Sequence, residues 1–326
     1  MTNKQRIWLF VGLIFVIGGL IFFFIPYLVT QKTWFWSFGE GTGFIGDTIG
    51  GIVGPMVGFI AVILTFLAFY IQFKANQVQI SALNEQKLTA QQQEKQILIQ
   101  QFENNFFEIL KLHRENVKEF DYRNNFGRNV IIKIINEFFE ILTTVQNSKI
   151  IKENKLDEQD VANISFTILF FGTDETVNDV LENRFRENYP KLYQSIINNI
   201  IVSLREHKLQ KVDERYIYNG HQSRLGHYFR HLWIIVLFVH KSTILTVDQK
   251  KDYIRILRAQ LSNHEQVLLF FHSISHLGLD WELSSEDKLI TEYNLIRNIP
   301  LGSIYGFDPK RYYPNIRLEH DFEAKT

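Results

Sequence analysis

Arginine and histidine side chains concentrate in two adjoining segments of the sequence, where they could transfer protons and bind anions. Eight of the ten His residues lie between His207 and His276. The first segment, 220–240, has the sequence GHQSRLGHYFRHLWIIVLFVH, and the second, 248–277, contains LRAQLSNHEQVLLFFHSISH. The candidate functional residues are Arg224, His227, Arg230 and His231 in the first segment, and Gln260, His264 and Glu265 in the second.

The first segment has the composition of a helix packed inside a bundle, because its later half is apolar on all sides. Its four candidate residues share one helical face. Buried Arg and His side chains need internal partners or a pocket, and no acidic residue occurs between Glu214 and Asp248. Glu265 in the second segment is therefore the expected counter-charge for a buried Arg.

Two interpretations of this cluster do not involve a metal. In the first, a structural polar network holds the helices in register. In the second, the cluster is a metal-independent ribonuclease site, where a His exchanges protons with the 2′-hydroxyl and the leaving oxygen while an Arg stabilises the phosphorane. The spacing from Arg224 to His231, or from Arg258 to His264, resembles the Arg-and-His helix motif of HEPN ribonucleases, which implies RNA as the substrate.

A third interpretation is a metal site, because His227 with His231, and His272 with His276, are spaced to share a helical face. Leu268 occupies the position at which a zincin motif starting from His264 would need its second His. We therefore predict no metal site. The sequence also lacks a Walker loop, a dinucleotide fingerprint and a serine-hydrolase elbow, so we expect no cofactor.

Two apolar stretches near the N-terminus predict a hairpin of transmembrane helices over residues 7–29 and 48–73. About 20 apolar residues suffice to cross a bilayer as a helix. Glycines recur at every fourth position at the start of the second stretch and form a smooth strip, which permits close packing within the hairpin or between copies of the chain. These glycines are Gly46, Gly50, Gly54 and Gly58. The lipid bilayer and a second copy of the chain are thus expected partners.

Basic residues beside the two stretches predict the orientation of the hairpin. Lys4 and Arg6 precede the first stretch, Lys74, Lys87 and Lys95 follow the second, and the loop between them has only Lys32. Cytoplasmic loops carry the excess of Lys and Arg. We therefore expect both the N- and the C-terminus of the chain in the cytoplasm.

The remaining sequence predicts helices without a sheet, because it contains no sustained period-two alternation. Helix starts are expected at Asp157, at Thr173 with Asp174 and Glu175, and at Thr246, which forms a capping box with Gln249. The predicted fold is all-α, with an N-terminal two-helix transmembrane hairpin followed by a helical cytoplasmic bundle domain. The predicted divisions are the hairpin (1–74), a Gln-rich helical stalk (75–101), the helical domain (102–299) and an irregular tail (300–326).

Composition excludes several classes of function. The 326-residue chain contains no Cys, which rules out disulfides, Cys-ligated zinc, iron–sulfur clusters and thiol catalysis. Its formal net charge is zero, so no broad electrostatic grip on nucleic acid is expected.

Four segments of the sequence are similar to a bacterial family of phage abortive infection proteins. They are FIGDTIGGIVGP, QFENNFFEILKLHRENV, GHQSRLGHYFRHLW and LRAQLSNHEQVLLFFHSIS. The resemblance implies a role in anti-phage defence, with a phage component as partner, and it places the predicted hairpin in the bacterial inner (plasma) membrane. It brings no established active site. The resulting hypothesis is a membrane-anchored defence protein whose helical domain senses infection or acts as effector. The alternatives are a HEPN-like ribonuclease and an effector that permeabilises the membrane through the glycine-rich hairpin.

Overall fold

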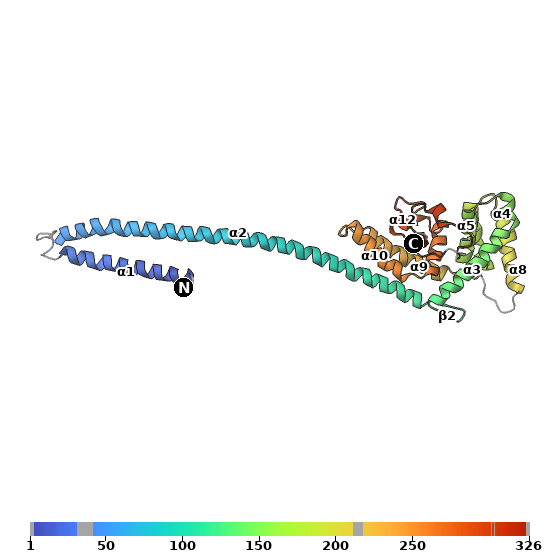
Figure 1. Cartoon of the computed structure of the whole chain (residues 1–326), viewed down its shortest axis with the longest axis horizontal. Helices are drawn as coiled ribbons and strands as arrows, with labels where there is room; N and C mark the ends of the chain where they lie inside the picture. Colours follow the sequence, from blue (N-terminus) through green and yellow to red (C-terminus); the bar gives the residue numbers. More distant parts are fainter. Residues whose placement is uncertain (1–2, 31–41, 211–217, 301, 303, 324–326) are drawn as a thin grey trace. The chain divides into compact units, whose positions relative to one another are not determined.

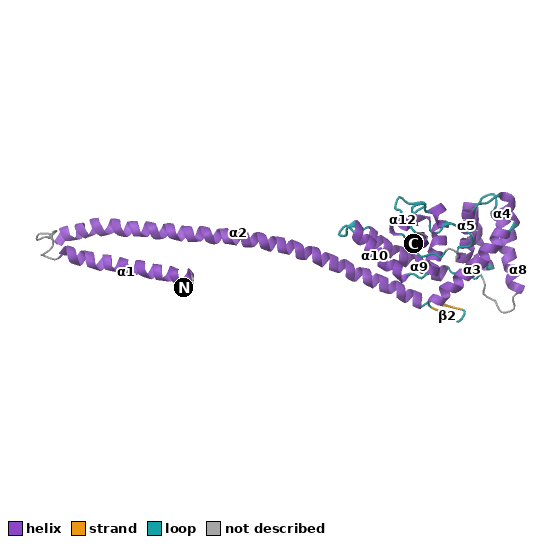
Figure 2. Cartoon of the chain, in the orientation of Figure 1, coloured by secondary structure: helices purple, strands orange, loops and turns teal. Residues whose placement is uncertain are grey.

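The computed structural model describes residues 3–30, 42–210, 218–300, 302 and 304–323, and these residues are mostly helical (Figures 1 and 2). The predicted all-α fold class is confirmed. The strands in the described part form one short hairpin, in which β1 (Asp121–Tyr122) pairs antiparallel with β2 (Asn125–Phe126). Its two turn residues have positive φ, as a two-residue type I′ turn requires. The chain divides into two compact units, Met1–Glu94 and Lys95–Thr326.

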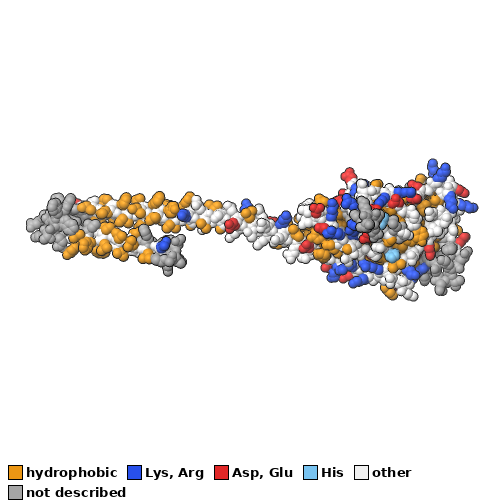
Figure 3. All heavy atoms as spheres, viewed as in Figure 1, with side chains coloured by type: hydrophobic (Ala, Val, Ile, Leu, Met, Phe, Trp, Pro, Cys, Tyr) orange, Lys and Arg blue, Asp and Glu red, His pale blue; other side chains and the backbone are white. Residues whose placement is uncertain are grey.

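The first unit contains α1 (Asn3–Thr30) and the beginning of α2 (Thr42–Lys118). Helix α1 and the first part of α2 carry many exposed hydrophobic side chains, such as Phe15 at 79% exposure and Phe66 at 70% (Figure 3). From Gly50 onward, α2 is long and apolar enough to cross a membrane. The predicted two-helix hairpin stays a prediction, because residues 31–41 between the two helices lie outside the described part.

Helix α2 runs without a break from the predicted second span through the predicted stalk. The sequence explains this continuity, because neither Gly nor Pro occurs between Gly58 and Gly127. A Cβ atom added at any glycine of the predicted strip would meet no atom within 4 Å. Packing of that strip against another helix therefore also stays a prediction.

The second unit contains the end of α2 and a set of shorter helices. These are α3 (Arg128–Asn147), α4 (Lys149–Asn154), α5 (Glu158–Phe171), η1 (Glu175–Val177), α6 (Asn178–Asn188), α7 (Tyr193–Ser195), the π-helical η2 (Ile196–Ile201), α8 (Val202–Gln210), α9 (Gln222–His240), α10 (Val247–Gln260), α11 (Asn263–Ile274), η3 (Leu279–Trp281), α12 (Leu289–Tyr293), α13 (Pro309–Tyr312) and α14 (His320–Glu323). The predicted caps at Asp157 and Thr246 are confirmed, and in the start predicted at Thr173 with Asp174 and Glu175 the capping residue is Asp174.

Helices α5 and α11 form the centre of this unit. All residues from Val161 to Leu169 in α5, and from Glu265 to Ile274 in α11, are buried. The segment after residue 300 is not wholly irregular, since it contains α13 and α14. Tyr313 lies fully buried there and its hydroxyl donates to Ser273 Oγ at 2.7 Å. This C-terminal segment is therefore part of the core.

Two glycines allow the chain to cross the end of α5 at close range. Gly172 has φ of 88° and Gly220 has φ of 81°, values that glycine adopts readily. The backbone N–H of Thr173 donates to the carbonyl of Tyr218 at 2.7 Å, and the N–H of His221 donates to the carbonyl of Phe170 at 2.9 Å. This crossing fixes the position at which α9 begins.

Candidate functional site

A cavity of about 330 Å³ lies where the ends of four helices meet in the second unit. The end of α2, the start of α3 and the junction between α10 and α11 each contribute side chains. The lining residues are His113, Arg114, Val117, Lys118, Arg128, Gln260 and Glu265. We call this cavity the basic cavity, because three of its side chains are Arg or Lys and one is acidic.

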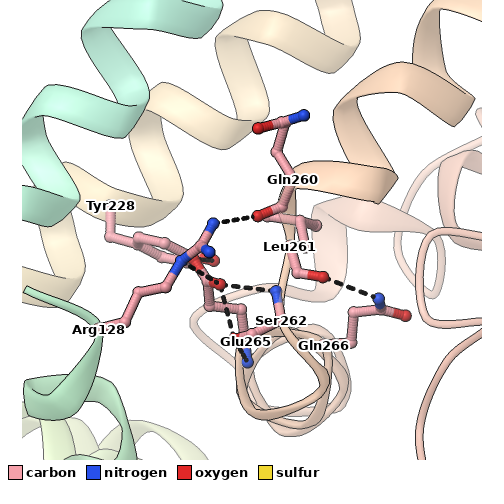
Figure 4. A network of polar contacts seen from close by, with 7 residues as sticks. All are labelled: Arg128, Tyr228, Gln260, Leu261, Ser262, Glu265 and Gln266. Atoms are coloured by element: carbon pink, nitrogen blue, oxygen red, sulfur yellow. Dashed lines mark hydrogen bonds and ion pairs between the residues drawn. The ribbon is translucent and has the colours of Figure 1, made fainter.

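Glu265 organises the polar contacts on the inner side of the basic cavity (Figure 4). Ser262 caps α11 and Glu265 is the third helical residue, so the two form a capping box. The backbone N–H and the hydroxyl of Ser262 both donate to Glu265 Oε2 at 2.7 Å. The side chain of Glu265 is only 1% exposed. A buried carboxylate is thereby held at the positive N-terminal end of a helix.

Arg128, the first residue of α3, connects this carboxylate to α10 (Figure 4). Its Nε lies 3.6 Å from Glu265 Oε2, and its guanidinium also donates to the carbonyl of Gln260. The Arg128 side chain remains 56% exposed. A guanidinium has five N–H donors, so Arg128 keeps donors for a ligand in the cavity.

An aromatic pair lies behind the carboxylate. The hydroxyl of Tyr228 in α9 donates to Glu265 Oε1 at 3.4 Å, and burial followed by the Glu265 charge raises the pKa of Tyr228. The ring of His113 lies 5.1 Å from that of Tyr228. His113 is 2% exposed, and neither ring nitrogen has a hydrogen-bond partner among the described residues. Burial, with smaller contributions from His231 and Arg128, lowers the pKa of His113 to about 4, so the ring is neutral at pH 7.

The remaining cations, Arg114 and Lys118, are exposed at the edge of the cavity. Together with Arg128 they outnumber the single carboxylate. Glu265 is a poor candidate for a general base, because Ser262, Tyr228 and Arg128 already engage both of its oxygens. The arrangement is suited to binding an anion, and phosphate is one of the anions that Arg and Lys side chains bind well.

Residues 220–304 match the family model described as "Putative phage abortive infection protein". The resemblance is thereby confirmed for this segment, which includes Tyr228, Gln260 and Glu265 of the site. The matched segment runs from the start of α9 to a point before α13 and leaves out α2 and α3, so His113 and Arg128 lie outside it. No curated protein and no solved structure matches the chain significantly.

Of the seven predicted site residues, the structure brings Gln260 and Glu265 to the basic cavity. Glu265 does act as a counter-charge, but for Arg128 and not for an Arg of α9. His264 is exposed. Arg258 donates to the carbonyls of Tyr293 and Asn294 at 3.3 and 3.2 Å, which assigns it a structural contact.

The four predicted residues of α9 do not line the basic cavity. Arg224 donates to the carbonyl of Asp121 at 3.1 Å, and Arg230 lines a different cavity. His227 is exposed and His231 is partly exposed. Burial, followed by His227 and Arg230, lowers the pKa of His231. A chemical role for these side chains stays a prediction.

The expectation that α9 is enclosed on all sides is wrong. Ile234, in its apolar later half, is 45% exposed, and Arg230 one turn earlier is also exposed. The composition of a helix indicates how much apolar surface it carries, but only its neighbours decide how much of that surface is covered. In the described part of the chain, no group of three or more His, Asp and Glu side chains is placed to hold a metal ion.

Sequence reasoning missed His113, Arg128 and Tyr228. One signal was available for His113, because it falls on the apolar stripe of its helix, four residues before Val117 and three after Leu110, both of which are buried. A polar residue on such a stripe is a candidate for a buried polar contact. No comparable local signal marks Arg128, whose partners are distant in sequence.

A second buried network lies where β1, α3 and the start of α9 meet. Glu137 accepts from the Tyr122 hydroxyl at 2.9 Å and from the Tyr218 backbone N–H at 3.0 Å, and its Oε2 lies 3.3 Å from His221 Nε2. Burial by itself would raise the pKa of Glu137, but His221, Tyr122 and the Tyr218 amide together lower it. This network places His221, the N-cap of α9, and so holds the helix that carries Tyr228.

The neutral, enclosed His113 predicts a pH dependence of stability. Its pKa is about 4 in the folded protein and 6.5 in a model peptide, so below pH 6.5 the unfolded chain binds a proton that the folded chain does not. Stability is therefore expected to fall as the pH is lowered from about 6.5 to about 4, with His113 contributing up to about 1.4 kcal/mol per pH unit.

The variant His113→Phe keeps an aromatic ring but removes this titration. Urea unfolding of the full chain in detergent, measured across this pH range, should give a shallower pH dependence for His113→Phe than for the wild type. His264→Gln, at an exposed position, provides the control and should keep the wild-type dependence. Equal slopes for wild type and His113→Phe would contradict the burial argument.

Proposed function

We propose that this chain is a membrane-anchored phage-defence protein of the abortive infection type, whose second unit senses infection by binding a phosphate-bearing ligand in the basic cavity. The match of residues 220–304 to a phage abortive infection family supports the biological setting. The long apolar α2 supports the membrane anchor. The Lys and Arg residues that flank the apolar stretches favour cytoplasmic termini, so the second unit would meet ligands inside the cell.

We infer the class of ligand from the cations around the basic cavity. Arg114, Lys118 and Arg128 line it, and Arg128 is held in place by Glu265 and the Gln260 carbonyl. A preorganised guanidinium loses little freedom when it binds a phosphate, whereas the two exposed cations add charge. The cavity of about 330 Å³ lies at the small end of the range of ligand pockets, about 300–1,000 Å³. A small phosphate-bearing molecule is therefore the expected ligand.

The geometry gives less support to the ribonuclease alternative. A general base must reach the proton that it removes, and His113 is enclosed while both Glu265 oxygens are engaged. Arg258 and His264 form one of the two Arg–His pairs that have the spacing of the HEPN motif, and neither residue lines this cavity. Binding a ligand involves no proton transfer. It requires only hydrogen-bond donors and positive charge, and the cavity has both.

The test is a plaque assay in bacteria that express the full chain. Wild type is expected to lower the plating efficiency of at least one phage in a diverse panel. The double variant Arg114→Gln/Lys118→Gln removes two exposed cations of the cavity and should restore plating to the level of cells with empty vector. Lys251→Gln/Arg255→Gln removes two exposed cations of α10 that do not line the cavity, and should protect like the wild type.

Two further measurements accompany the assay. Cell fractionation should recover all three proteins in equal amount with the membranes, and calorimetric titration of the purified protein with pyrophosphate should give binding that the cavity double variant loses. Full protection by the cavity double variant would refute the sensing role. Normal plating of every phage on wild-type cells would refute the defence role, and recovery of the protein in the aqueous fraction without detergent would refute the anchor.

A further inference from the structure

A second cavity, of about 270 Å³, lies beside α9 on residues that the basic cavity does not use. Aromatic rings from four elements form most of its wall. They are Phe170 of α5, Phe229 and Trp233 of α9, His272 of α11 and Trp281 of η3. We call it the aromatic cavity. All but one of these rings lie within residues 220–304.

Two glycines shape the wall of this cavity. A Cβ added at Gly226 would have the ring of Phe170 as its nearest neighbour, at 3.8 Å, so this face of α9 has room beside it. At Gly278 an added Cβ would come within 2.4 Å of the His272 carbonyl oxygen. The chain can therefore turn tightly after α11 only with glycine at this position, and the turn brings Trp281 to the cavity.

The rings are arranged as rigid walls. The ring of His272 stacks on that of Phe229, with centroids 3.7 Å apart and planes 13° apart. Trp233 and Trp281 meet edge to face, with centroids at 4.8 Å. Flat aromatic surfaces bind planar rings by stacking and edge contacts, which contribute beyond the area that they bury. The wall therefore favours a flat ligand over a branched aliphatic one.

One basic and one acidic side chain also line the aromatic cavity. Arg230 and Asp280 both line it and are exposed to solvent, so the cavity offers a strong donor and a strong acceptor. His272 is 6% exposed and its Nδ1 has no hydrogen-bond partner among the described residues. Burial lowers the pKa of His272 to about 3. The imidazole is thus neutral at pH 7 and has one donor and one acceptor nitrogen.

We infer that the aromatic cavity binds a small neutral heteroaromatic molecule with hydrogen-bond donors and acceptors on its edge, the chemistry of a nucleobase or nucleoside. Stacking by the aromatic wall accounts for the flat ring, and Arg230 with Asp280 accounts for the mixed polar edge. A cavity of about 270 Å³ has room for one such small molecule. This inference does not depend on the proposed phosphate ligand, since the two cavities share no lining residue.

Tryptophan fluorescence of the full chain in detergent tests the inference directly, because Trp233 and Trp281 are two of the five Trp residues and both line the cavity. Excitation at the red edge of tryptophan absorption avoids absorption by the probes adenosine, guanosine, cytidine and uridine. At least one nucleoside should change the fluorescence in a saturable manner. Arg230→Gln should weaken its affinity about tenfold, the loss of one charge-assisted hydrogen bond.

Gly226→Leu fills the cavity and should abolish the saturable change, whereas Arg255→Gln, an exposed Arg outside the cavity, should leave it intact. Thermal unfolding of each variant shows whether it is folded. If Gly226→Leu does not fold, the test rests on Arg230→Gln, because Arg230 is exposed and its substitution should not disturb the fold. The inference fails if no nucleoside gives a saturable change, if Arg230→Gln binds like wild type, or if indole binds and the nucleosides do not. Arg114→Gln/Lys118→Gln should retain nucleoside binding, which separates this site from the basic cavity.

Discussion

Substitution of Gly172 by alanine is expected to prevent the second unit from reaching its native fold. Gly172 has φ of 88°, where an L side chain is strained, and an added Cβ would lie 2.6 Å from backbone atoms of Asn219, Gly220 and Tyr218. Backbone strain alone costs about 1–3 kcal/mol. The clash cannot be relieved by rotating a side chain, so we expect a total loss above about 4 kcal/mol, which is exceptional for one substitution.

Gly226→Ala provides the matched control for this prediction. Gly226 lies within α9 with no positive φ, and its added Cβ would only touch the Phe170 ring at 3.8 Å. Alanine should stabilise the helix there by about 0.5–1 kcal/mol. Thermal unfolding of the full-length variants, followed by circular dichroism, compares the two. A melting temperature for Gly172→Ala within a few degrees of wild type would show that the crossing of residues 218–221 over α5 is not as described.

The second large effect is expected for Glu265→Ala, which should destabilise the second unit by about 3 kcal/mol. The substitution removes half of the capping box, worth about 1 kcal/mol. It also leaves the fully buried Tyr228 hydroxyl without its acceptor, which costs about 1–3 kcal/mol. The contribution of Arg128 to this loss should be small, because its side chain is 56% exposed and solvent screens the ion pair.

Three variants separate these contributions. Arg128→Ala should cost less than about 1 kcal/mol, the upper end for an exposed ion pair, and Glu265→Gln should lie between Arg128→Ala and Glu265→Ala, since the amide keeps an acceptor oxygen. Chemical denaturation of the full chain in detergent gives the three values. We attribute most of the stabilisation by Glu265 to its buried contacts with Ser262 and Tyr228. If Arg128→Ala lowered the free energy of unfolding as much as Glu265→Ala, the ion pair would be the main contribution and this attribution would be wrong.

The two cavities give α9 and α11 a common role. Tyr228 of α9 and Glu265 of α11 support the basic cavity, whereas Phe229 and His272 of the same helices form the wall of the aromatic one. Successive residues of a helix point in different directions, so one helix can serve both sites. Gly226→Leu therefore tests the aromatic cavity and Glu265→Ala the support of the basic cavity, although both residues lie in the same pair of helices.

The sequence by itself determined the properties that depend on near neighbours in the chain. The caps at Asp157 and Thr246 follow from hydrogen bonds over three residues, and the all-helical class follows from apolar spacing within each segment. The similarity of residues 220–304 to the abortive infection family could likewise be recognised from ordered segments. Each of these signals is complete within a short stretch of sequence.

Tertiary structure alone decided which polar residues meet. Arg128 binds the carbonyl of Gln260, 132 residues away, and helical periodicity says which residues share a face of α9 but not which helix lies opposite. Glu265 was predicted as the counter-charge of a buried Arg; it does pair with an Arg, but this is Arg128, whose side chain is 56% exposed. Contacts of this kind depend on how the ends of α2, α3 and α11 pack together, and that packing is determined by burial of the whole core and not by any one segment.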